Sequence, residues 1–385
     1  MSNTQPLVIV GGGPVGLALA LALQQQQLPV TVLESRAQGA SHQDQRALAL
    51  SYGTKLILDK LGVWEAVAPH TTAINSIHIS QRGGLGRSTL KASEHALPAL
   101  GYVVAYGALM QALDGAINHA DIRYEAAATL IRHQNDHAEV EFDCNGVMQQ
   151  MTSPLLVVAD GGRSLDDIPG MTRETKAYGH DALVSKVSCE LPHHNIAYER
   201  FTPAGPMALL PNGPRDFSLV WTGEKSLIDR LLALDDATFL RELHAAFGDR
   251  VGRFLSIQKR MSFPLKLSQM NAALTPHLVV VGNAAQTMHP VAGQGFNVGM
   301  RDAWALASLL RQASFDTWGS QEMLATYQKQ RQRDSKGGLL FTDFLVNVFS
   351  NDLLGFAPLR GVGLGLLQML PPIKRFLVNK MSYGK

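Results

Sequence analysis

The sequence predicts an α/β fold, in which a parallel sheet with helices carries an inserted, mainly antiparallel β-sheet. Residues 7–10 (LVIV) and 278–281 (LVVV) are short apolar runs, and a glycine and a helical pattern follow each of them. Buried strands that alternate with helices favour a parallel sheet. Between these two runs, residues 197–202, 207–210 and 217–221 have strand patterns without helical ones between them, which predicts the inserted sheet.

The composition is that of a chain with one or two globular domains. It has 385 residues, of which 46% are hydrophobic, and it contains 35 glycines. Its 34 Lys and Arg against 32 Asp and Glu give a net charge of only +2, so it lacks the basic excess that is typical of a nucleic-acid-binding protein. Because Cys144 and Cys189 are too few for a disulfide framework or a zinc site, we expect a reducing cytosol and no metal site.

The apolar N-terminal segment has the length of a signal-peptide core but a different pattern. No Lys or Arg precedes it, and Gly11, Gly13 and Gly16 lie near its start, where a signal peptide or a spanning helix would have leucine. The pattern fits a strand at Leu7–Val10, a tight turn, and a helix through Leu17–Leu23.

The three glycines, with Pro14 and Val15 between the second and the third, fit the pattern G-x-G-x-x-G. The first glycine permits the turn, the second lets the backbone approach a pyrophosphate, and the third lets the helix pack on the strand. The N–H groups and the dipole of the helix then face the phosphates. A tight turn without a ligand is the alternative.

The next predicted strand, Pro29–Leu33, ends at Glu34. An acid about 20 residues after the glycine pattern hydrogen-bonds ribose hydroxyls, and its charge disfavours a 2′-phosphate. Strand, turn, helix and acid together predict a bound adenine dinucleotide.

Two further polar residues lie next to predicted elements. Arg46, in DQRALALS before a predicted helix at Tyr52–Leu61, either contacts a diphosphate or is a solvated loop cation. Asp160 follows the predicted strand Leu155–Ala159 and lies either at a strand tip or merely in a loop. The sequence leaves both choices open.

A second glycine-rich segment comes late in the chain. The predicted strand Leu278–Val281 precedes a turn at Gly282, a stiff loop at Pro290–Gly295 and a helix at Asn297–Leu310. Glycines 293, 295 and 299 leave backbone N–H groups open to a flat polar ring. A nicotinamide dehydrogenase has no use for this second site, whereas an extended FAD places its adenosine on the first site and its flavin on the second. The sequence therefore predicts FAD.

Four segments carry a family resemblance: VIVGGGPVGLALALAL, DQRALALS, VVADGGRS and GNAAQTMHPVAGQGFNVGMRDA. The chain resembles the flavin-dependent aromatic hydroxylases of the para-hydroxybenzoate hydroxylase superfamily, and within it the ubiquinone-biosynthesis hydroxylases. In the last segment Asn283 replaces the family's aspartate, and Gln286 replaces its histidine. Asn283 can still hydrogen-bond hydroxyls, though without charge.

The resemblance implies a set of residues that contact FAD. They are Gly11, Gly13, Pro14, Val15, Gly16, Glu34, Arg46, Asp160, Gly282, Asn283, Pro290, Ala292, Gly293, Gln294, Gly295, Phe296 and Asn297. It also implies a reaction in which a flavin C4a-hydroperoxide inserts one atom of O2 into a polyprenylated phenol. No second G-x-G-x-x-G is present, so NAD(P)H is expected to dock only transiently as the electron donor.

The catalytic residues are less defined than the cofactor site. Deprotonation of the phenol would favour the reaction, and His289, with Pro290 beside it, is the nearest candidate in the sequence. Alternatively, a histidine before a proline in a tight loop has a structural role. Another ring hydroxylation of the same pathway, a flavin-dependent prenyl reductase and a non-catalytic flavoprotein scaffold remain alternatives.

The predicted organisation has three parts. Residues 1–175 and 268–345 build a Rossmann-like FAD-binding domain, residues 176–267 form the substrate-binding sheet, and residues 346–385 form a C-terminal helical segment that faces a membrane. This last segment contains the basic residues Arg360, Lys374, Arg375, Lys380 and Lys385, and it has no Asp or Glu after Leu353. Because Pro358 and several glycines interrupt its apolar run, we expect either peripheral contact with the inner face of the cell membrane or a helical cap. Assembly with other ubiquinone-biosynthesis proteins is a further expectation.

Overall fold

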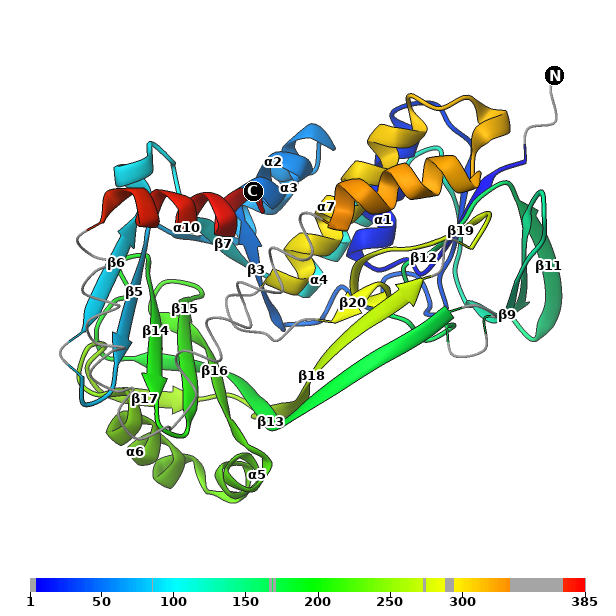
Figure 1. Ribbon diagram of the computed structural model, residues 1–385. Coiled ribbons are helices and arrows are strands. Elements are labelled where there is room, and N and C mark those ends of the chain that lie inside the picture. The colour runs from blue at the N-terminus through cyan, green and yellow to red at the C-terminus, as the bar shows by residue number, and fades with distance from the viewer. Residues whose placement is uncertain are drawn as a thin grey trace.

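The computed structural model describes residues 5–84, 86–165, 168, 171–272, 275–287, 294–332 and 370–384. Two bodies of structure lie side by side, and a long pair of strands runs between them (Figure 1). One body is built on a parallel sheet with helices, and the other is built on a mainly antiparallel sheet. The predicted α/β fold is confirmed.

The parallel sheet has five strands in the order β19-β12-β1-β2-β8. Their bounds are Leu7–Val10 for β1, Val30–Leu33 for β2, Asp121–Arg123 for β8, Leu156–Val158 for β12 and Leu278–Val280 for β19. All four residues of β1 are buried, as expected for a central parallel strand that is covered on both faces. The N-terminal and late glycine segments thus begin at two strands that a single strand, β12, separates.

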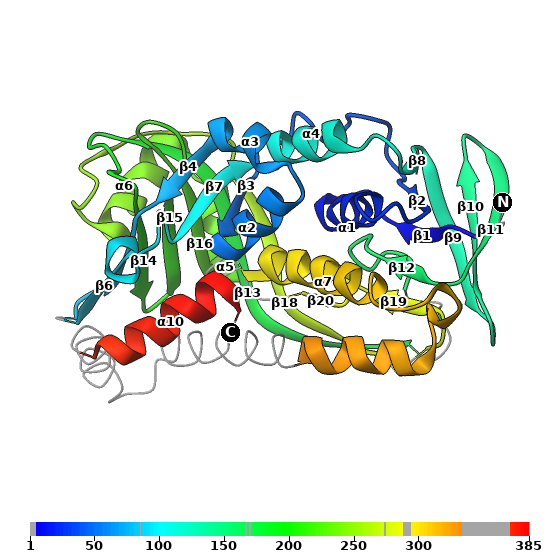
Figure 2. The same cartoon turned by 90° about the horizontal axis from the view of Figure 1, so that it is seen from above.

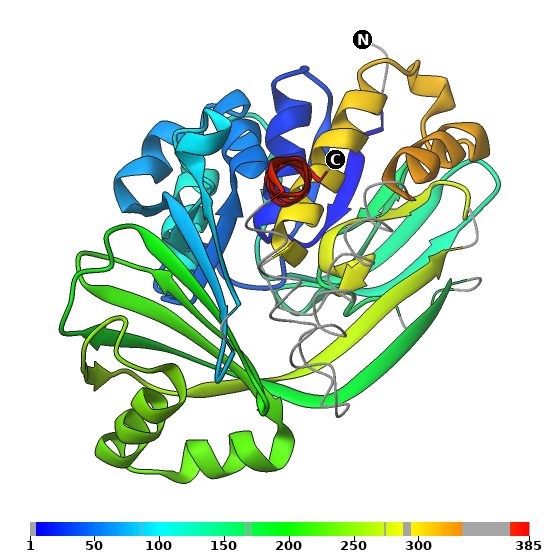
Figure 3. The same cartoon turned by 60° about the vertical axis from the view of Figure 1, so that its left-hand side comes forward.

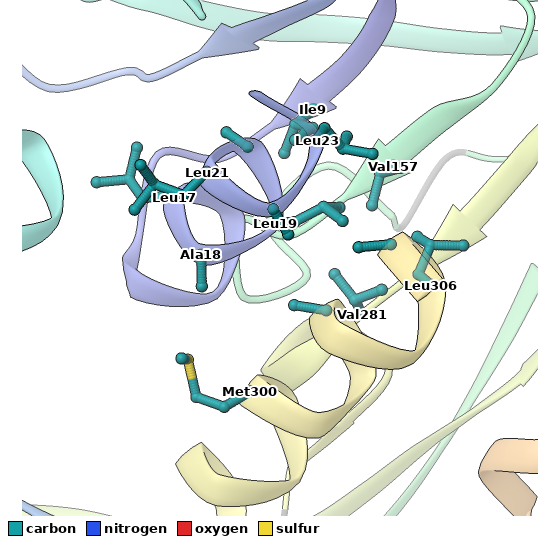
Figure 4. Close-up of a cluster of buried hydrophobic side chains, with 14 of the residues drawn as sticks. Ile9, Leu17, Ala18, Leu19, Leu21, Leu23, Val157, Val281, Met300 and Leu306 are labelled. Carbon is teal, nitrogen blue, oxygen red and sulfur yellow. The ribbon is translucent and has the colours of Figure 1, made fainter. Parts of the chain in front are cut away.

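Helices α1 and α7 cover this sheet. They span Pro14–Gln24 and Gln294–Leu310, and Figure 2 shows them side by side. Apolar side chains from β1, α1, β12 and α7, among them Ile9, Leu19, Val157 and Leu306, point toward one another beneath the helices (Figure 4). Burial of this apolar cluster fixes the two glycine segments relative to each other.

Two three-stranded antiparallel sheets and several helices complete this body. One sheet has the order β3-β7-β4 and the other β11-β10-β9. Their bounds are Ala47–Ser51 for β3, Thr71–Ile74 for β4, Gly101–Ala105 for β7, Ala126–His133 for β9, Ala138–Cys144 for β10 and Val147–Ser153 for β11. The helices are α2 at Tyr52–Lys60, α3 at Trp64–Val67, η1 at Ala68–His70, η2 at Ala92–His95, α4 at Tyr106–Ala116, η3 at Gly282–Ala284 and η5 at Phe315–Thr317. Residues 321–332 are also helical.

The second body is built on a nine-stranded sheet. Eight strands have the order β20-β18-β13-β16-β15-β14-β5-β6, and β17 pairs with β13. Their bounds are Ser76–Gln81 for β5, Arg87–Lys91 for β6, Met171–Cys189 for β13, Ile196–Thr202 for β14, Gly205–Pro211 for β15, Asp216–Glu224 for β16, Phe254–Ile257 for β17, Met261–Ala272 for β18 and Gln286–Thr287 for β20. The 19-residue strand β13 pairs with β18 from Met171 to Val184 and with β16 from His180 to Ser188, so it connects the two bodies.

Two helices cover one face of this sheet, α5 at Lys225–Ala233 and α6 at Asp236–Phe247 (Figure 3). Met207 and Leu209 of β15 point into the apolar cluster beneath these helices. Because side chains alternate along a strand, Ala208 and Leu210 point to the opposite face, and Leu210 packs against residues of β4 and β7. This second face is the one turned toward the parallel-sheet body.

The predicted domain limits can be compared with the strands of the structure. Residue 175 lies within β13, and residue 268 lies within β18. Strand β5 pairs with β14 and β6 pairs with β5 in the nine-stranded sheet, although the residues of both precede the predicted inserted segment. The division into domains therefore stays a prediction.

The C-terminal helix α10 spans Pro371–Tyr383. Its Leu377 and Val378 are buried against Leu90, Ala92 and Leu100 from the region of β6 and η2. The apolar run that precedes α10 lies outside the described residues. Among the described residues, no helix has the length and apolar character that a bilayer crossing needs.

Candidate cofactor site

One cavity of about 1100 Å³ joins the two glycine segments to the nine-stranded sheet. It is slightly larger than the ~300–1,000 Å³ that small-ligand pockets usually have. Gly13 and Glu34 line it at the first glycine segment, Asn283 and Phe296 line it at the second, and Val220 lines it from the sheet. A long ligand could therefore contact both glycine segments within one cavity.

The first and third glycines of the N-terminal turn are required by the protein itself. Gly11 has a φ of +108°, and a Cβ there would lie 2.6 Å from the backbone nitrogen of Asp160. A Cβ on Gly16 would lie 2.0 Å from the carbonyl oxygen of Gly11, where α1 crosses β1. Both positions exclude a side chain through contact with the backbone.

Gly13 differs, because the fold of the protein has space for a side chain at this position. Its φ is −72°, and the nearest atom to a Cβ there would be the Tyr106 hydroxyl at 3.9 Å. This glycine lines the cavity, and no side chain caps the start of α1 that follows it. Pro14 and Val15, the first residues of α1, also line the cavity. An open glycine before an uncapped helix N-terminus allows a pyrophosphate to approach the backbone closely.

Glu34 lies at the end of β2 and is buried. Its carboxylate accepts hydrogen bonds from the backbone N–H of Gly12 at 2.8 Å and from the Arg36 backbone N–H and Nε at 2.9 and 2.7 Å. Burial by itself raises the pKa of Glu34, but the Arg36 hydrogen bonds and charge, together with the Gly12 hydrogen bond, outweigh it and lower the net pKa. Glu34 is therefore ionised at neutral pH and can accept hydrogen bonds from a ribose.

Two arginines line the cavity beside Glu34. The pKa of Arg36 is raised, chiefly by its hydrogen bonds to Glu34. Arg46 pairs with Asp44 at 2.5 Å, and its guanidinium lies 5.1 Å from the centre of the Tyr106 ring. Arg46 was anticipated as a diphosphate ligand or a loop cation, whereas Arg36 was missed. Arg36 lies two residues after Glu34, and this spacing could have indicated that it belongs to the site.

Asp160 lines the cavity after β12 and also shapes its own turn. Its carboxylate accepts hydrogen bonds from the backbone N–H groups of Gly162 at 2.8 Å and Ser164 at 2.9 Å. This geometry stabilises the turn next to Gly11. Arg163 and Lys186 also line the cavity, so its wall has basic side chains besides Arg36 and Arg46.

The second glycine segment is stabilised by a buried ion pair. Gly282 has a φ of +65°, and its N–H donates to Asp302 Oδ2 at 3.0 Å. Asp302 Oδ1 in turn accepts from Arg331 Nε at 2.5 Å. The turn that presents Asn283 is thus held by the middle of α7, and Asn283 itself is exposed to the cavity.

Gly295 and Phe296 lie in the first turn of α7. The nearest atom to a Cβ on Gly295 would be Asn283 Oδ1 at 3.8 Å, so this glycine, like Gly13, is open. The side chain of Gln294 is not described, and the candidates His289, Pro290, Ala292 and Gly293 lie outside the described residues.

Asn297 has a different role for its side chain. The amide is buried, accepts hydrogen bonds from the Ser51 backbone N–H and the Thr54 hydroxyl, both at 2.7 Å, and donates to the Ala49 carbonyl at 2.9 Å. Any cofactor contact of Asn297 would therefore use its backbone. The Asn297 side chain instead ties the start of α7 to β3 and α2.

The residues present fit an extended FAD. An ionised acid lines the cavity at the first glycine segment, and an open glycine and an uncapped helix start adjoin it. At the second segment Asn283 and Phe296 line the cavity, and the open Gly295 lies next to both. No group of three or more metal-ligating side chains occurs within the described ranges. The geometry provides for a dinucleotide with a second planar ring system.

Comparison with known proteins gives the same picture. Residues 4–339 match the FAD binding domain family. The chain is 35% identical to the ubiquinone hydroxylase UbiL of Rhodospirillum rubrum, over 97% of this chain and 88% of that protein. It is 32% identical to the 3-demethoxyubiquinol 3-hydroxylase of Escherichia coli, over 96% of each chain. The crystal structure of p-nitrophenol 4-monooxygenase PnpA from Pseudomonas putida has the same fold, with a TM-score of 0.80 at 18% identity over 99% of both chains.

Proposed function

Because the chain belongs to the FAD-binding family that includes ubiquinone-biosynthesis hydroxylases, we propose that it hydroxylates a polyprenylated phenol in ubiquinone biosynthesis. The protein is an FAD-dependent monooxygenase. The observation that carries the proposal is one cavity, which Glu34 lines at the first glycine segment, Asn283 and Phe296 line at the second, and Val184 and Val220 line from the nine-stranded sheet. The wall that the sheet forms leaves room for a ring substrate next to the flavin end.

The specific substrate that we propose is a 2-polyprenyl-6-methoxyphenol, with a 2-polyprenyl-6-methoxy-1,4-benzoquinol as the product. The segments GNAAQ, ERFTPAGPMALLP and SLVW support this choice, because they resemble those of 2-octaprenyl-6-methoxyphenol hydroxylase. Phenol, O2, NAD(P)H and a proton give quinol, water and NAD(P)⁺, so the electrons balance with NAD(P)H as transient donor. The bound FAD would supply the activation of O2.

The residues of the chain would bind, orient and shield the reactants. Glu34 would hold the adenosine ribose, Gly13 and the start of α1 would hold the pyrophosphate, and the first turn of α7 would hold the flavin ring. Val184 and Val220 on the nine-stranded sheet would exclude water from the opposite side. Exclusion of water matters because it prevents the loss of activated oxygen as peroxide.

Peripheral membrane contact at the inner face of the cell membrane belongs to the same proposal, because a polyprenyl tail dissolves in the bilayer. Support comes from α10, which exposes 45% of Ile373 and 62% of Phe376 beside the exposed Arg375. Apolar side chains next to a cation are typical of interfacial helices. Lys374 does not contribute to this surface, because it is buried and donates to Glu94 Oε2 at 3.4 Å. Assembly with other ubiquinone-biosynthesis proteins stays a prediction.

The test uses purified protein with FAD, NAD(P)H and a short-chain 2-prenyl-6-methoxyphenol under ¹⁸O2. The expected result is oxidation of NAD(P)H that depends on the phenol, and a quinol that contains one ¹⁸O. Saturation of the prenyl chain without O2 would identify a reductase instead. Bound FAD that NAD(P)H and phenol cannot reduce would identify a scaffold. Oxygen at another ring position would identify a different hydroxylation, as the name of the Escherichia coli relative illustrates.

A further inference from the structure

Glu199 lies in the middle of β14 on the face that is turned toward the cofactor cavity. Its neighbours in sequence point the other way: the Tyr198 ring packs 5.7 Å from the Phe247 ring of α6, and Arg200 Nε donates to the Ala246 carbonyl at 3.3 Å. Since side chains alternate along a strand, Glu199 points away from α5 and α6. It therefore shares a face with Ala197, which packs near Val103 of β7.

The sheet register connects Glu199 to the cavity wall. Glu199 pairs with Ala208 of β15, Ala208 pairs with Val220 of β16, and Val220 pairs with Val184 of β13. Val184 and Val220 both line the cavity, and so does Leu210. With about 5 Å between neighbouring strands, Glu199 lies roughly 10 Å from Val220 along this row. Ala208, which lies between them, has only a methyl group, and both Ala208 and Glu199 are half-buried. A substrate that extends from the cavity along this row would reach the carboxylate.

The described strands around Glu199 supply no counter-charge to its carboxylate. Strands β15 and β4 have no titratable side chain. The one such side chain of β5, His78, lies 5.8 Å from Tyr198 on the opposite face, and Tyr102 of β7 packs on Trp64 at 4.8 Å. In the part of the chain that the structure describes, no hydrogen bond or ion pair to the Glu199 carboxylate is formed. An acid without a partner in an apolar interior lowers stability, so a structural role does not account for it.

This environment changes the acidity of the carboxyl. The Glu199 side chain is half-buried, and desolvation of its carboxyl raises its pKa to about 8. Phenols such as tyrosine have an ordinary pKa of about 10. A base whose pKa is close to that of its proton donor and to the working pH transfers protons more effectively than an ordinary carboxylate. Perturbed acids of this kind are concentrated at functional sites.

We propose that Glu199 is the catalytic base that removes the phenolic proton of the substrate, an inference that rests on the proposed function. The phenol O–H bond breaks, its electron pair stays on the phenolic oxygen, and a new O–H bond forms on a Glu199 carboxylate oxygen. The phenolate ring is richer in electrons and so is a better acceptor of oxygen than the phenol. The proton returns to solvent or to product after turnover.

The principal test replaces Glu199 with glutamine, which keeps the size and hydrogen-bonding capacity but cannot take the proton. We expect FAD content to be unchanged and kcat to fall by about 10²- to 10⁴-fold. In wild type, kcat/KM should rise with pH through about 8, because the base must be deprotonated, and Glu199→Gln should lose this limb. Glu224→Gln is the matched control, because Glu224 is an exposed acid on β16, and it should keep the limb.

Two further measurements distinguish proton transfer from a structural role. A phenol analogue whose own pKa lies below the assay pH should restore most of the activity of Glu199→Gln, because it arrives already ionised. The ultraviolet spectrum of a short-chain phenol bound to the oxidised, FAD-loaded protein should show phenolate at lower pH in wild type than in Glu199→Gln, without any turnover.

The outcomes separate this inference from the proposed function. Hydroxylation with an unchanged pH profile in Glu199→Gln, or no rescue by the acidic phenol, would overturn the role of Glu199 and leave the function standing. Absence of hydroxylation in wild type would overturn the function. Phenolate formation that depends on Glu199 would then still support the inference.

Discussion

The Asn297 side chain accepts a hydrogen bond from the backbone N–H of Ser51 at 2.7 Å, although 246 residues separate the two in sequence. Ser51 is the N-cap of α2, where its hydroxyl accepts from the Thr54 N–H at 3.2 Å. Through this contact one buried amide aligns the start of α7 with the end of β3. The position of the proposed flavin site thus depends on a contact between two segments that lie far apart in the sequence.

The first prediction concerns Asn297→Ala. The change would leave the Ser51 N–H, the Thr54 hydroxyl and the Ala49 carbonyl without their buried partner, at about 1–3 kcal/mol for each group left unpaired. We expect a lower Tm and a lower ratio of FAD to protein in the purified variant. Asn379→Ala on the exposed side of α10 is the control and should change stability by less than about 0.5 kcal/mol. Unchanged Tm and FAD content in Asn297→Ala would contradict this structural role.

The second prediction contrasts two glycines of the same turn. Gly16→Ala should destabilise the protein itself, because its Cβ would lie 2.0 Å from the Gly11 carbonyl oxygen. Gly13→Ala should leave the Tm of the FAD-free protein nearly unchanged, since the nearest atom would be 3.9 Å away, and should weaken FAD binding strongly. Thermal unfolding without FAD and titration with FAD measure the two effects. If Gly13→Ala binds FAD as tightly as wild type, the pyrophosphate does not lie at Gly13.

The sequence predicted the features that local patterns determine. The strand Leu7–Val10 is confirmed residue for residue, and the predicted strand Leu278–Val281 and helix Tyr52–Leu61 differ from the structure by one residue each. Both glycine segments also line one cavity, as the expected binding of one extended FAD to both of them requires. Each of these features follows from apolar runs, glycines and helix periodicity within a short window.

Other features depend on contacts between distant segments, and the sequence did not show them. Strand β5 pairs in parallel with β14, more than a hundred residues later, and nothing in SIHISQ identifies that partner. The side chain of Asn297 belongs to the cofactor segment but hydrogen-bonds β3 and α2. Glu199 was seen only as part of an alternating strand, since its lack of a counter-charge appears only when the neighbouring strands are in place.

The third prediction follows from the pKa of Glu34, which is lowered from its ordinary value of 4.5. A group with a lowered pKa in the folded state stabilises the protein fully above its unfolded pKa, and this contribution is lost as pH falls through the folded pKa. The difference in free energy of unfolding between wild type and Glu34→Gln should therefore be constant above about pH 5 and should shrink below about pH 4.5. Urea titrations at several pH values measure this difference. A difference that does not change with pH would show that the charge on Glu34 does not stabilise the fold.

The last prediction separates the two sides of α10. On the buried side, Lys374→Glu should lower the Tm, because Lys374 is enclosed and its ammonium group faces Glu94. On the exposed side, Ile373→Ser combined with Phe376→Ser should leave the Tm and FAD content unchanged, because both side chains are largely solvent-exposed.

If this exposed side of α10 rests on a membrane, the double variant should bind anionic liposomes more weakly and turn over a long-chain phenol more slowly, while turnover of a short-chain phenol stays the same. Arg375→Glu should weaken liposome binding as well, and wild-type binding should fall as salt is added, because salt screens the attraction to anionic lipid. Liposome binding that neither variant alters would exclude this face of α10 as the membrane contact. The role of α10 would then be to cover strands β5 and β6 with its buried side.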